Sequence, residues 1–154
     1  MTLKKRLLLT LYYDDGYFCL SRNFRLQKVG NIDWLLGSYP FSEIAKAIDE
    51  LVIINVSSKS FEEGSRKFLS DIDQILSEIF IPITLGGGLR KMEHVKKLFE
   101  FGSDKIILNR AILEDQFFVK QITSAYGSQS VVASIDFKKV GNDYYSFLSP
   151  GIEK

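Results

Sequence analysis

Short apolar segments alternate with amphipathic helical segments along most of this 154-residue sequence. The apolar segments are dense in Val, Ile and Leu and lie at residues 6–12, 50–56, 81–85, 105–109 and 131–136. They lack a strict alternation of apolar and polar residues, which is typical of strands covered on both faces. The pattern therefore predicts five buried strands.

Apolar residues recur at helical spacing between these strands, from Phe68 to Ile79 and from Met92 to Phe99. A third helix is predicted at residues 115–125 and a weaker one at residues 41–48. Strands and helices in regular succession indicate βαβ units with a parallel sheet and right-handed crossovers. The α/β fold class is then either an open doubly wound sheet or a (βα) barrel.

The pattern changes after the fifth strand. Residues 138–140 and 144–148 flank Gly141-Asn142-Asp143, whose residue types tolerate positive φ, so they predict a β-hairpin. A complete eight-unit barrel takes about 250 residues, and five eighths of that is roughly 156. We therefore predict a single partial, TIM-type (βα)8-barrel domain over residues 1–154, with about five βα units and a hairpin after strand five.

Charge and cysteine content exclude several classes of protein. Twenty basic and nineteen acidic side chains leave a formal net charge of +1, which gives no field that would favour nucleic acid or an anionic membrane as partner. The single cysteine, Cys19, cannot form an internal disulfide. Basic residues before Leu7-Leu8-Leu9 resemble a signal peptide, but Thr10 interrupts the apolar run and no cleavage site follows. We expect a cytoplasmic protein.

Polar residues divide between the two ends of the predicted strands. Arg6, Glu50 and Lys105 stand at strand beginnings, where ordinary solvated flanks are the simplest interpretation. The strand ends, where barrel enzymes place their chemistry, carry Tyr12, Asn55, Ser57, Asn109 and Asp136.

Three successive glycines, Gly86, Gly87 and Gly88, follow the third strand directly. Bare backbone N–H groups in such a turn can close around a phosphate. The alternative is a tight turn that needs positive φ, for which one glycine would suffice.

Other residues have plainer interpretations. His94 lies among charged neighbours and is predicted to face solvent, and Cys19 is predicted to be a packing residue. Metal-ligand spacing is absent, and we expect neither a metal nor a cofactor. Four aromatic residues are predicted to fill the barrel mouth or core: Tyr12, Tyr13, Tyr17 and Phe18.

Four sequence blocks resemble a known family when they are taken together. They are FIPITLGGGLR at residues 80–90, GSDKIILN at 102–109, YGSQ at 126–129 and VVASID at 131–136. Their order and spacing are similar to those of the cyclase subunit of imidazole glycerol phosphate synthase over almost the whole chain, above all residues 49–148.

The resemblance implies a (βα)8 barrel that receives ammonia from a glutaminase partner docked at its bottom. Ammonia passes through the barrel to a bisphosphorylated ribonucleotide at the top, which yields imidazole glycerol phosphate for histidine synthesis and a carboxamide ribotide for purine synthesis. By position, Arg6, Glu50 and Lys105 match the charged gate at the ammonia entrance. Asp49 and Asp104 match residues that face the glutaminase.

At the top, the resemblance implies that Gly86, Gly87, Gly88 and Asn109 bind one phosphate of the substrate. Asp136 matches one of two carboxylates that perform general acid/base catalysis.

The sequence departs from the family at the first catalytic carboxylate. Tyr12 stands where the family has an essential aspartate, and a phenol, which ordinarily titrates near pH 10, cannot readily replace it as a base. Asp14, two residues on, is predicted to point away from this spot. The other departures are Leu20 for a lysine on a flexible loop, Asn55 for an aspartate and Arg110 for a small hydroxyl residue.

Three functions are compatible with these residues. The first is the ammonia-dependent cyclase or lyase of the family, with a glutaminase partner. The second is a divergent paralogue that delivers ammonia to a sugar acceptor in surface-polysaccharide synthesis. The third is a non-catalytic phosphate-binding or assembly module, since a five-stranded open sheet would expose two edges and invite self-association.

Overall fold

The fold is known from a computed structural model, which describes residues 5–23 and 25–147. A seven-stranded sheet in the order β3-β2-β1-β4-β5-β6-β7 forms its centre. Five of these strands are parallel to one another. They are β1 (Leu8–Asp14), β4 (Glu50–Asn55), β5 (Ile83–Gly86), β6 (Lys105–Leu108) and β7 (Val131–Ala133). The alternating units are those of an open TIM-type (βα) barrel, so the predicted fold class is confirmed.

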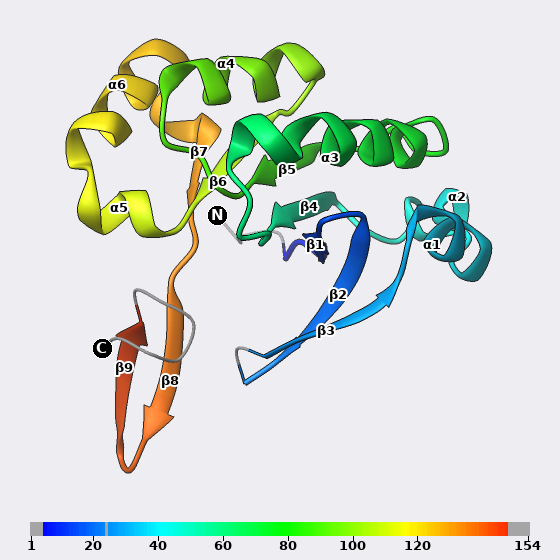
Figure 1. Ribbon diagram of the computed structural model, residues 1–154, viewed down its shortest axis with the longest axis horizontal. Coiled ribbons are helices and arrows are strands. Elements are labelled where there is room, and N and C mark those ends of the chain that lie inside the picture. The colour runs from blue at the N-terminus through cyan, green and yellow to red at the C-terminus, as the bar shows by residue number, and fades with distance from the viewer. Residues whose placement is uncertain (1–4, 24, 148–154) are drawn as a thin grey trace.

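Helices α3 (Phe61–Leu76), α4 (Met92–Phe101), α5 (Arg110–Glu114) and α6 (Gln116–Tyr126) all lie over one face of these strands (Figure 1). A capping box between Ser60 and Glu63 starts α3, and Gly102, with φ of 114°, ends α4. A short 3₁₀ turn, η1 (Ser128–Ser130), leads into β7.

Strand periodicity divides the sheet residues between its two faces. The helix-covered face carries fully buried apolar side chains, among them Leu51, Ile53, Leu85 and Ile106. Glu50, Thr84 and Lys105 alternate with these residues and belong to the opposite face, where they hydrogen-bond to one another. The parallel strands therefore combine an apolar core beneath the helices with a cluster of polar side chains at the amino ends of the opposite face.

The predicted strand boundaries differ from the structure by up to three residues. β1 begins at Leu8 rather than at residue 6, and β7 ends at Ala133 because the chain leaves the sheet before Asp136. The predicted helix at residues 41–48 is only the four-residue α2 (Phe41–Ile44).

A second hairpin and a helix between Tyr17 and Ser38 were not predicted from the sequence. β2 (Tyr17–Arg22) pairs antiparallel with β1, β3 (Arg25–Gly30) pairs with β2, and α1 (Ile32–Ser38) follows. β1 is therefore internal, and the edges of the sheet are β3 and β7. The expectation of a five-stranded open sheet is wrong, because β2 and β3 add two antiparallel strands beside β1.

The predicted C-terminal hairpin is present as β8 (Asp136–Val140) and β9 (Asp143–Phe147), a separate two-stranded sheet. Leu148, which the sequence assigned to it, lies outside the described residues. Both hairpins, β2–β3 and β8–β9, extend from the side of the sheet that the helices leave open (Figure 1).

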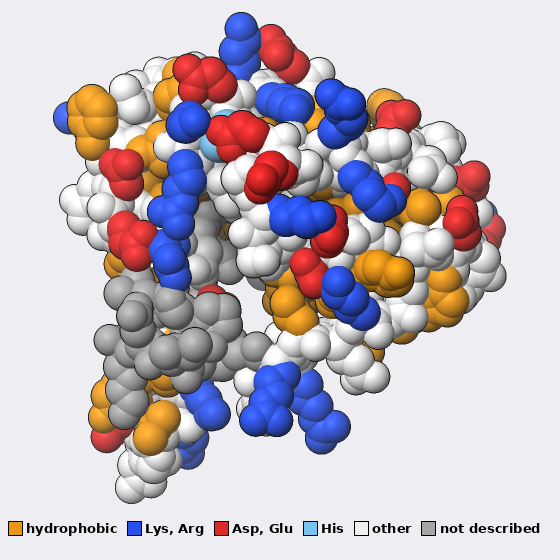
Figure 2. Space-filling view, viewed as in Figure 1, with side chains coloured by type: hydrophobic (Ala, Val, Ile, Leu, Met, Phe, Trp, Pro, Cys, Tyr) orange, Lys and Arg blue, Asp and Glu red, His pale blue; other side chains and the backbone are white. Residues whose placement is uncertain are grey.

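The helical surface carries Lys and Arg side chains interspersed with Asp and Glu side chains (Figure 2). None of the helices in the described part of the chain has the length and the apolar content that a membrane span requires.

Candidate functional site

A cleft of about 300 Å³ opens at the carboxyl ends of the parallel strands. The predicted top-face residues all line it: Tyr12, Asn55, Ser57, Asn109 and Asp136. They come from four different strands or the residues that follow them, so the fold itself brings them together. Since barrel enzymes hold their reacting groups at this end, the cleft is the candidate site.

The triple-glycine turn forms one wall of the cleft. Gly86 is buried in β5, where a Cβ would collide with the backbone carbonyl of Ile107. Gly87, at φ of 108°, passes so close to the carbonyl oxygen of Asn55 that no side chain fits. Gly88, at φ of 67°, has open space beside it and is exposed. Only Gly87 and Gly88 line the cleft, and close packing rather than a ligand accounts for Gly86.

Asn109 holds Asp136 at the cleft. Its side-chain amide donates to the backbone carbonyl of Ser134 at 2.9 Å and to Oδ2 of Asp136 at 3.1 Å. The backbone N–H of Ser134 in turn donates to the carbonyl of Leu108 at 2.7 Å. These bonds fix the chain where it leaves β7 for β8, and they keep the half-buried Asp136 carboxylate beside the end of β6.

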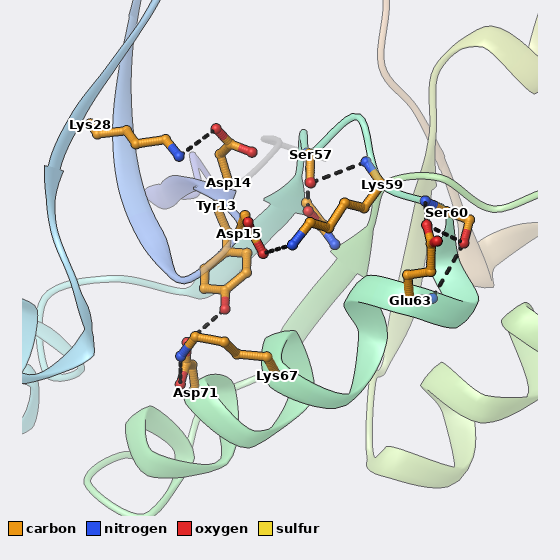
Figure 3. Close-up of polar contacts among 11 residues, drawn as sticks. Tyr13, Asp14, Asp15, Lys28, Ser57, Lys59, Ser60, Glu63, Lys67 and Asp71 are labelled. Atoms are coloured by element: carbon orange, nitrogen blue, oxygen red, sulfur yellow. Dashed lines mark hydrogen bonds and ion pairs between the residues drawn. The ribbon is translucent and has the colours of Figure 1, made fainter.

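Tyr12 faces the cleft, whereas its neighbour Tyr13 is buried on the helix side of β1. Asp14 forms an ion pair with Lys28 of β3 at 3.1 Å (Figure 3). Asp14 is absent from the lining of the cleft, in agreement with the prediction that it points elsewhere.

Two arginines stand at the rim of the cleft. Arg90 follows the glycine turn, and Arg110 follows Asn109 directly. Glu114 forms an ion pair with each arginine. Nη1 of Arg90 lies 3.5 Å from Oε2 of Glu114, and Nε of Arg110 lies 3.4 Å from its Oε1.

At the opposite ends of the strands, Glu50 is the centre of a charged network. Its Oε2 accepts from Arg6 and from Lys105, each at 2.7 Å, and its Oε1 accepts from the Thr84 hydroxyl. Burial alone would raise the pKa of Glu50. Hydrogen bonds from Lys105 and Thr84, and the charges of Lys105 and Arg6, outweigh burial and lower the pKa below its ordinary value.

The structure thus joins Arg6, Glu50 and Lys105, which the sequence related only by their position at strand beginnings. Glu50 is buried, with its side chain 3% exposed, so the interpretation of all three as solvated flanks is wrong for Glu50.

Asp49 and Asp104 make equivalent contacts one residue before their strands. Asp49 Oδ2 accepts from the backbone N–H of Leu7 at 2.8 Å, and the N–H of Asp49 donates to the Leu7 carbonyl. Asp104 repeats this pair of bonds with Ile83. Each carboxylate therefore stabilises the contact between the amino ends of two neighbouring strands, β1 and β4 for Asp49 and β5 and β6 for Asp104.

His94 is buried rather than solvent-facing, so that prediction is wrong. Its ring stacks on Phe61 of α3, with centroids 4.4 Å apart. Nδ1 accepts from the backbone N–H of Arg90 at 3.3 Å, and Nε2 lies 2.9 Å from Oε1 of Glu62. His94 links the segment after the glycine turn to α3. The residues next to His94 in the sequence do not predict this contact.

The predictions for the remaining residues of β2 are confirmed in part. Cys19 is buried as predicted, and burial raises the pKa of its thiol. Phe18 is in the core, but Tyr17 is 46% exposed and fills neither core nor cleft. Leu20 lies in strand β2 instead of a flexible loop. Among the described residues, no group of His, Cys, Asp or Glu side chains could hold a metal ion.

Known proteins resemble this chain over nearly its whole length. The profile of the family described as histidine biosynthesis protein matches residues 42–151. A protein of Parasynechococcus marenigrum named "Putative imidazole glycerol phosphate synthase subunit hisF2" is 45% identical over 149 residues, which are 97% of this chain and 55% of the relative. The imidazole glycerol phosphate synthase subunit HisF of Pelodictyon phaeoclathratiforme is 37% identical over 150 residues, 97% of this chain and 57% of the relative.

The HisF subunit of Dictyoglomus thermophilum is 40% identical over 103 residues, which cover 67% of this chain and 40% of that protein. The chain therefore spans about half the length of the curated relatives it matches.

Proposed function

Because the chain belongs to the histidine biosynthesis protein family, we propose that it provides an ammonia-dependent cyclase or lyase site of the imidazole glycerol phosphate synthase type. Its substrate would be a phosphorylated ribonucleotide, and its ammonia would come from a glutaminase partner. The observation that carries this proposal is a single cleft that gathers Gly87, Gly88, Asn109 and Asp136.

The Glu50 network supports a route for ammonia. Glu50, Thr84 and Lys105 lie at the amino ends of their strands, on the face that the helices leave open. Ile54 and Ile107 follow on the same face of β4 and β6, because side chains alternate along a strand, and both line the cleft. Ammonia that passed the network would travel along this face to Asp136.

The roles of the cleft residues follow from their chemistry. Backbone N–H groups at Gly87 and Gly88 would bind one phosphate, with the Asn109 amide beside them. Asp136 would serve as the general acid or base, since a carboxylate oriented by the Asn109 amide can exchange a proton with a ligand in the cleft. Arg6, Glu50 and Lys105 would form the ammonia gate, and the surface near Asp49 and Asp104 would face the glutaminase.

Tyr12 favours a second candidate function, the transfer of ammonia to a sugar acceptor. A hydroxyl donor replaces a carboxylate in the cleft, while the Glu50 network at the other end is intact. Changed chemistry at the acceptor with an unchanged ammonia entrance is what a divergent paralogue would need.

Turnover with ammonium as nitrogen source tests both candidates. The chain is assayed with the phosphorylated ribonucleotide of histidine synthesis and, separately, with a panel of phosphorylated and nucleotide-linked sugars. Product from the ribonucleotide supports the first function, and product from a sugar alone supports the second. Asp136→Asn should abolish either activity, whereas Asp143→Asn, an equal change at the exposed tip of the β8–β9 hairpin, should not.

The variant Tyr12→Asp distinguishes the two candidate functions further. Under the first function, this change should raise turnover of the ribonucleotide. Absence of turnover by both proteins with every acceptor would reject an enzyme and leave a phosphate-binding module. Self-association of such a module, through the edges β3 and β7, would show as a dimer or larger species in light scattering.

A further inference from the structure

The segment that joins β5 to α4, residues 87–91, is held by a single backbone hydrogen bond. The N–H of Arg90 donates to Nδ1 of His94 at 3.3 Å. Among the described residues, this is the only hydrogen bond that a backbone N–H of the segment makes. The N–H groups of Gly87 and Gly88 are therefore available to an anion, and His94 supports the end of the turn that presents them.

The surroundings of His94 determine which ring nitrogen carries the proton. A backbone N–H can only donate, so the bond from Arg90 requires an unprotonated Nδ1. Nε2 lies 2.9 Å from Oε1 of Glu62, and a carboxylate can only accept, so Nε2 carries the proton. A hydrogen bond from its own backbone N–H, and then those from His94 and Lys91, lower the pKa of Glu62 to about 2. This carboxylate therefore keeps its charge throughout the range in which an imidazole ordinarily titrates.

The imidazole is buried and has little freedom to turn. Its side chain is 7% exposed, and it stacks on Phe61 with the ring planes 17° apart. The charged residues around it come from three segments: Glu62 from α3, Arg90 and Lys91 from the segment before α4, and Glu93 and Lys97 from α4. Within the described structure, Glu62 is the only one of these whose side chain contacts the imidazole. A proton added at Nδ1 faces the N–H of Arg90, donor against donor, so that backbone has to move.

We propose that His94 makes anion binding at the glycine turn depend on pH. The neutral imidazole holds the backbone of Arg90, so that the N–H groups of Gly87 and Gly88 are positioned for a phosphoryl group. When Nδ1 gains a proton, it no longer accepts from Arg90, and the turn binds the anion less tightly. The inference rests on the proposed function, because it takes the glycine turn as the phosphate site. It adds a regulation of that site, in which acid conditions release a phosphorylated ligand.

His94 is the only histidine of the sequence, so a change in binding between about pH 5 and 8 can be assigned to one side chain. Sulfate is the probe, because it keeps two negative charges over this range, whereas inorganic phosphate does not. Isothermal titration of the whole chain should give a Kd for sulfate about threefold higher at about pH 5.5 than at about pH 7.5.

Two variants separate the acceptor from the charge. His94→Asn places an amide oxygen near the position of Nδ1 and does not titrate, so its Kd should stay low at both pH values. His94→Phe keeps a ring against Phe61 but has no acceptor, so its Kd should be about threefold higher at both. Lys96→Ala, an exposed change on the same helix, is the matched control and should keep the pH dependence of the unchanged chain. Thermal melts verify that each variant is folded.

Nitrogen NMR of the unchanged chain gives a readout that needs no variant. At about pH 7.5 the imidazole of His94 should carry its proton on Nε2, and saturating sulfate should move its titration to lower pH, because binding and protonation oppose each other. A sulfate Kd that does not change with pH, or an equal change in His94→Asn, would overturn the inference and leave the phosphate site standing. Failure to bind sulfate at either pH would overturn the phosphate site, and the proposed function and this inference with it.

Discussion

The hydroxyl of Tyr13 donates a 2.6 Å hydrogen bond to Oδ2 of Asp71, which joins β1 to α3 across 58 residues of sequence (Figure 3). Both residues are buried, and Lys67 bonds the same carboxylate at 3.1 Å. Adjacent residues of a strand point to opposite faces, so this bond also determines that Tyr12 faces the cleft. A contact beneath the sheet thus orients a residue of the candidate site.

Tyr13→Phe should lower the free energy of unfolding by about 1–2 kcal/mol, because Oδ2 of the buried Asp71 loses its shortest hydrogen bond and keeps only the contact with Lys67. Urea denaturation measures the loss. Tyr17→Phe is the control, since Tyr17 is 46% exposed, and it should change stability by less than about 0.5 kcal/mol.

The same hydroxyl should make the protein sensitive to alkali. Burial, and then the hydrogen bond to Asp71, raise the pKa of Tyr13 far above its ordinary value. The folded state therefore retains a proton that the unfolded state loses near pH 10, and stability should fall as the pH rises beyond that value. Tyr13→Phe should flatten this fall in unfolding curves measured between about pH 9 and 11. An unchanged slope would contradict the assignment.

Much of the fold is predictable from the sequence because five strands are continuous apolar runs. The β2–β3 hairpin is not, since its residues lack a long apolar run. Local turn signals nevertheless mark both turns of this segment. Asp15 and Gly16, with φ of 49° and 92°, form the turn between β1 and β2, and Asn23, with φ of 52°, lies in the turn between β2 and β3. An Asp-Gly pair before a β-rich segment is a strong hairpin signal. The Asp15-Gly16 pair therefore predicts the antiparallel pairing of β1 with β2.

The candidate site was predictable where residues follow strands directly, as Asn109 does. Contacts between distant segments were not. His94 has Glu93 beside it in sequence, yet Phe61 and Glu62, more than thirty residues earlier, determine its burial. Glu114 likewise joins Arg90 to Arg110 only because two βα units stand side by side. Residue types and spacing carry no information on such pairings.

Alanine substitutions at Gly87 and Gly88 should differ in cost, because a steric clash arises at Gly87 and only backbone strain arises at Gly88. Gly87→Ala places a Cβ against the carbonyl of Asn55 and should lower stability by at least about 3 kcal/mol. Gly88→Ala meets no atom within 4 Å and bears only the left-handed backbone, at about 1 kcal/mol. Equal losses on urea denaturation would show that the backbone at Gly87 has room to move.

Glu50→Gln should destabilise the protein by about 2 kcal/mol at neutral pH, because a buried carboxylate with three donors is lost. The pKa of Glu50 is lowered in the folded state, so its stabilisation is complete above the ordinary value near 4.3 and disappears as the pH falls through the folded value. The difference between the two proteins should shrink below about pH 4. Glu43→Gln, in an exposed pair with Lys46, should show neither effect.

His94→Phe should keep the ring stacked on Phe61 and remove both polar contacts of the imidazole. The backbone N–H of Arg90 then loses its acceptor, and Glu62 loses one of its partners, for a cost of about 1–2 kcal/mol. Because this N–H lies two residues after Gly88, the turn should also hold an anion less firmly, and the Kd for inorganic phosphate should rise about threefold. Lys96→Ala, an exposed position on the same helix, provides the comparison for both measurements. A His94→Phe protein that unfolds at the same urea concentration and binds phosphate equally well would show that the imidazole fills space and does not position the turn.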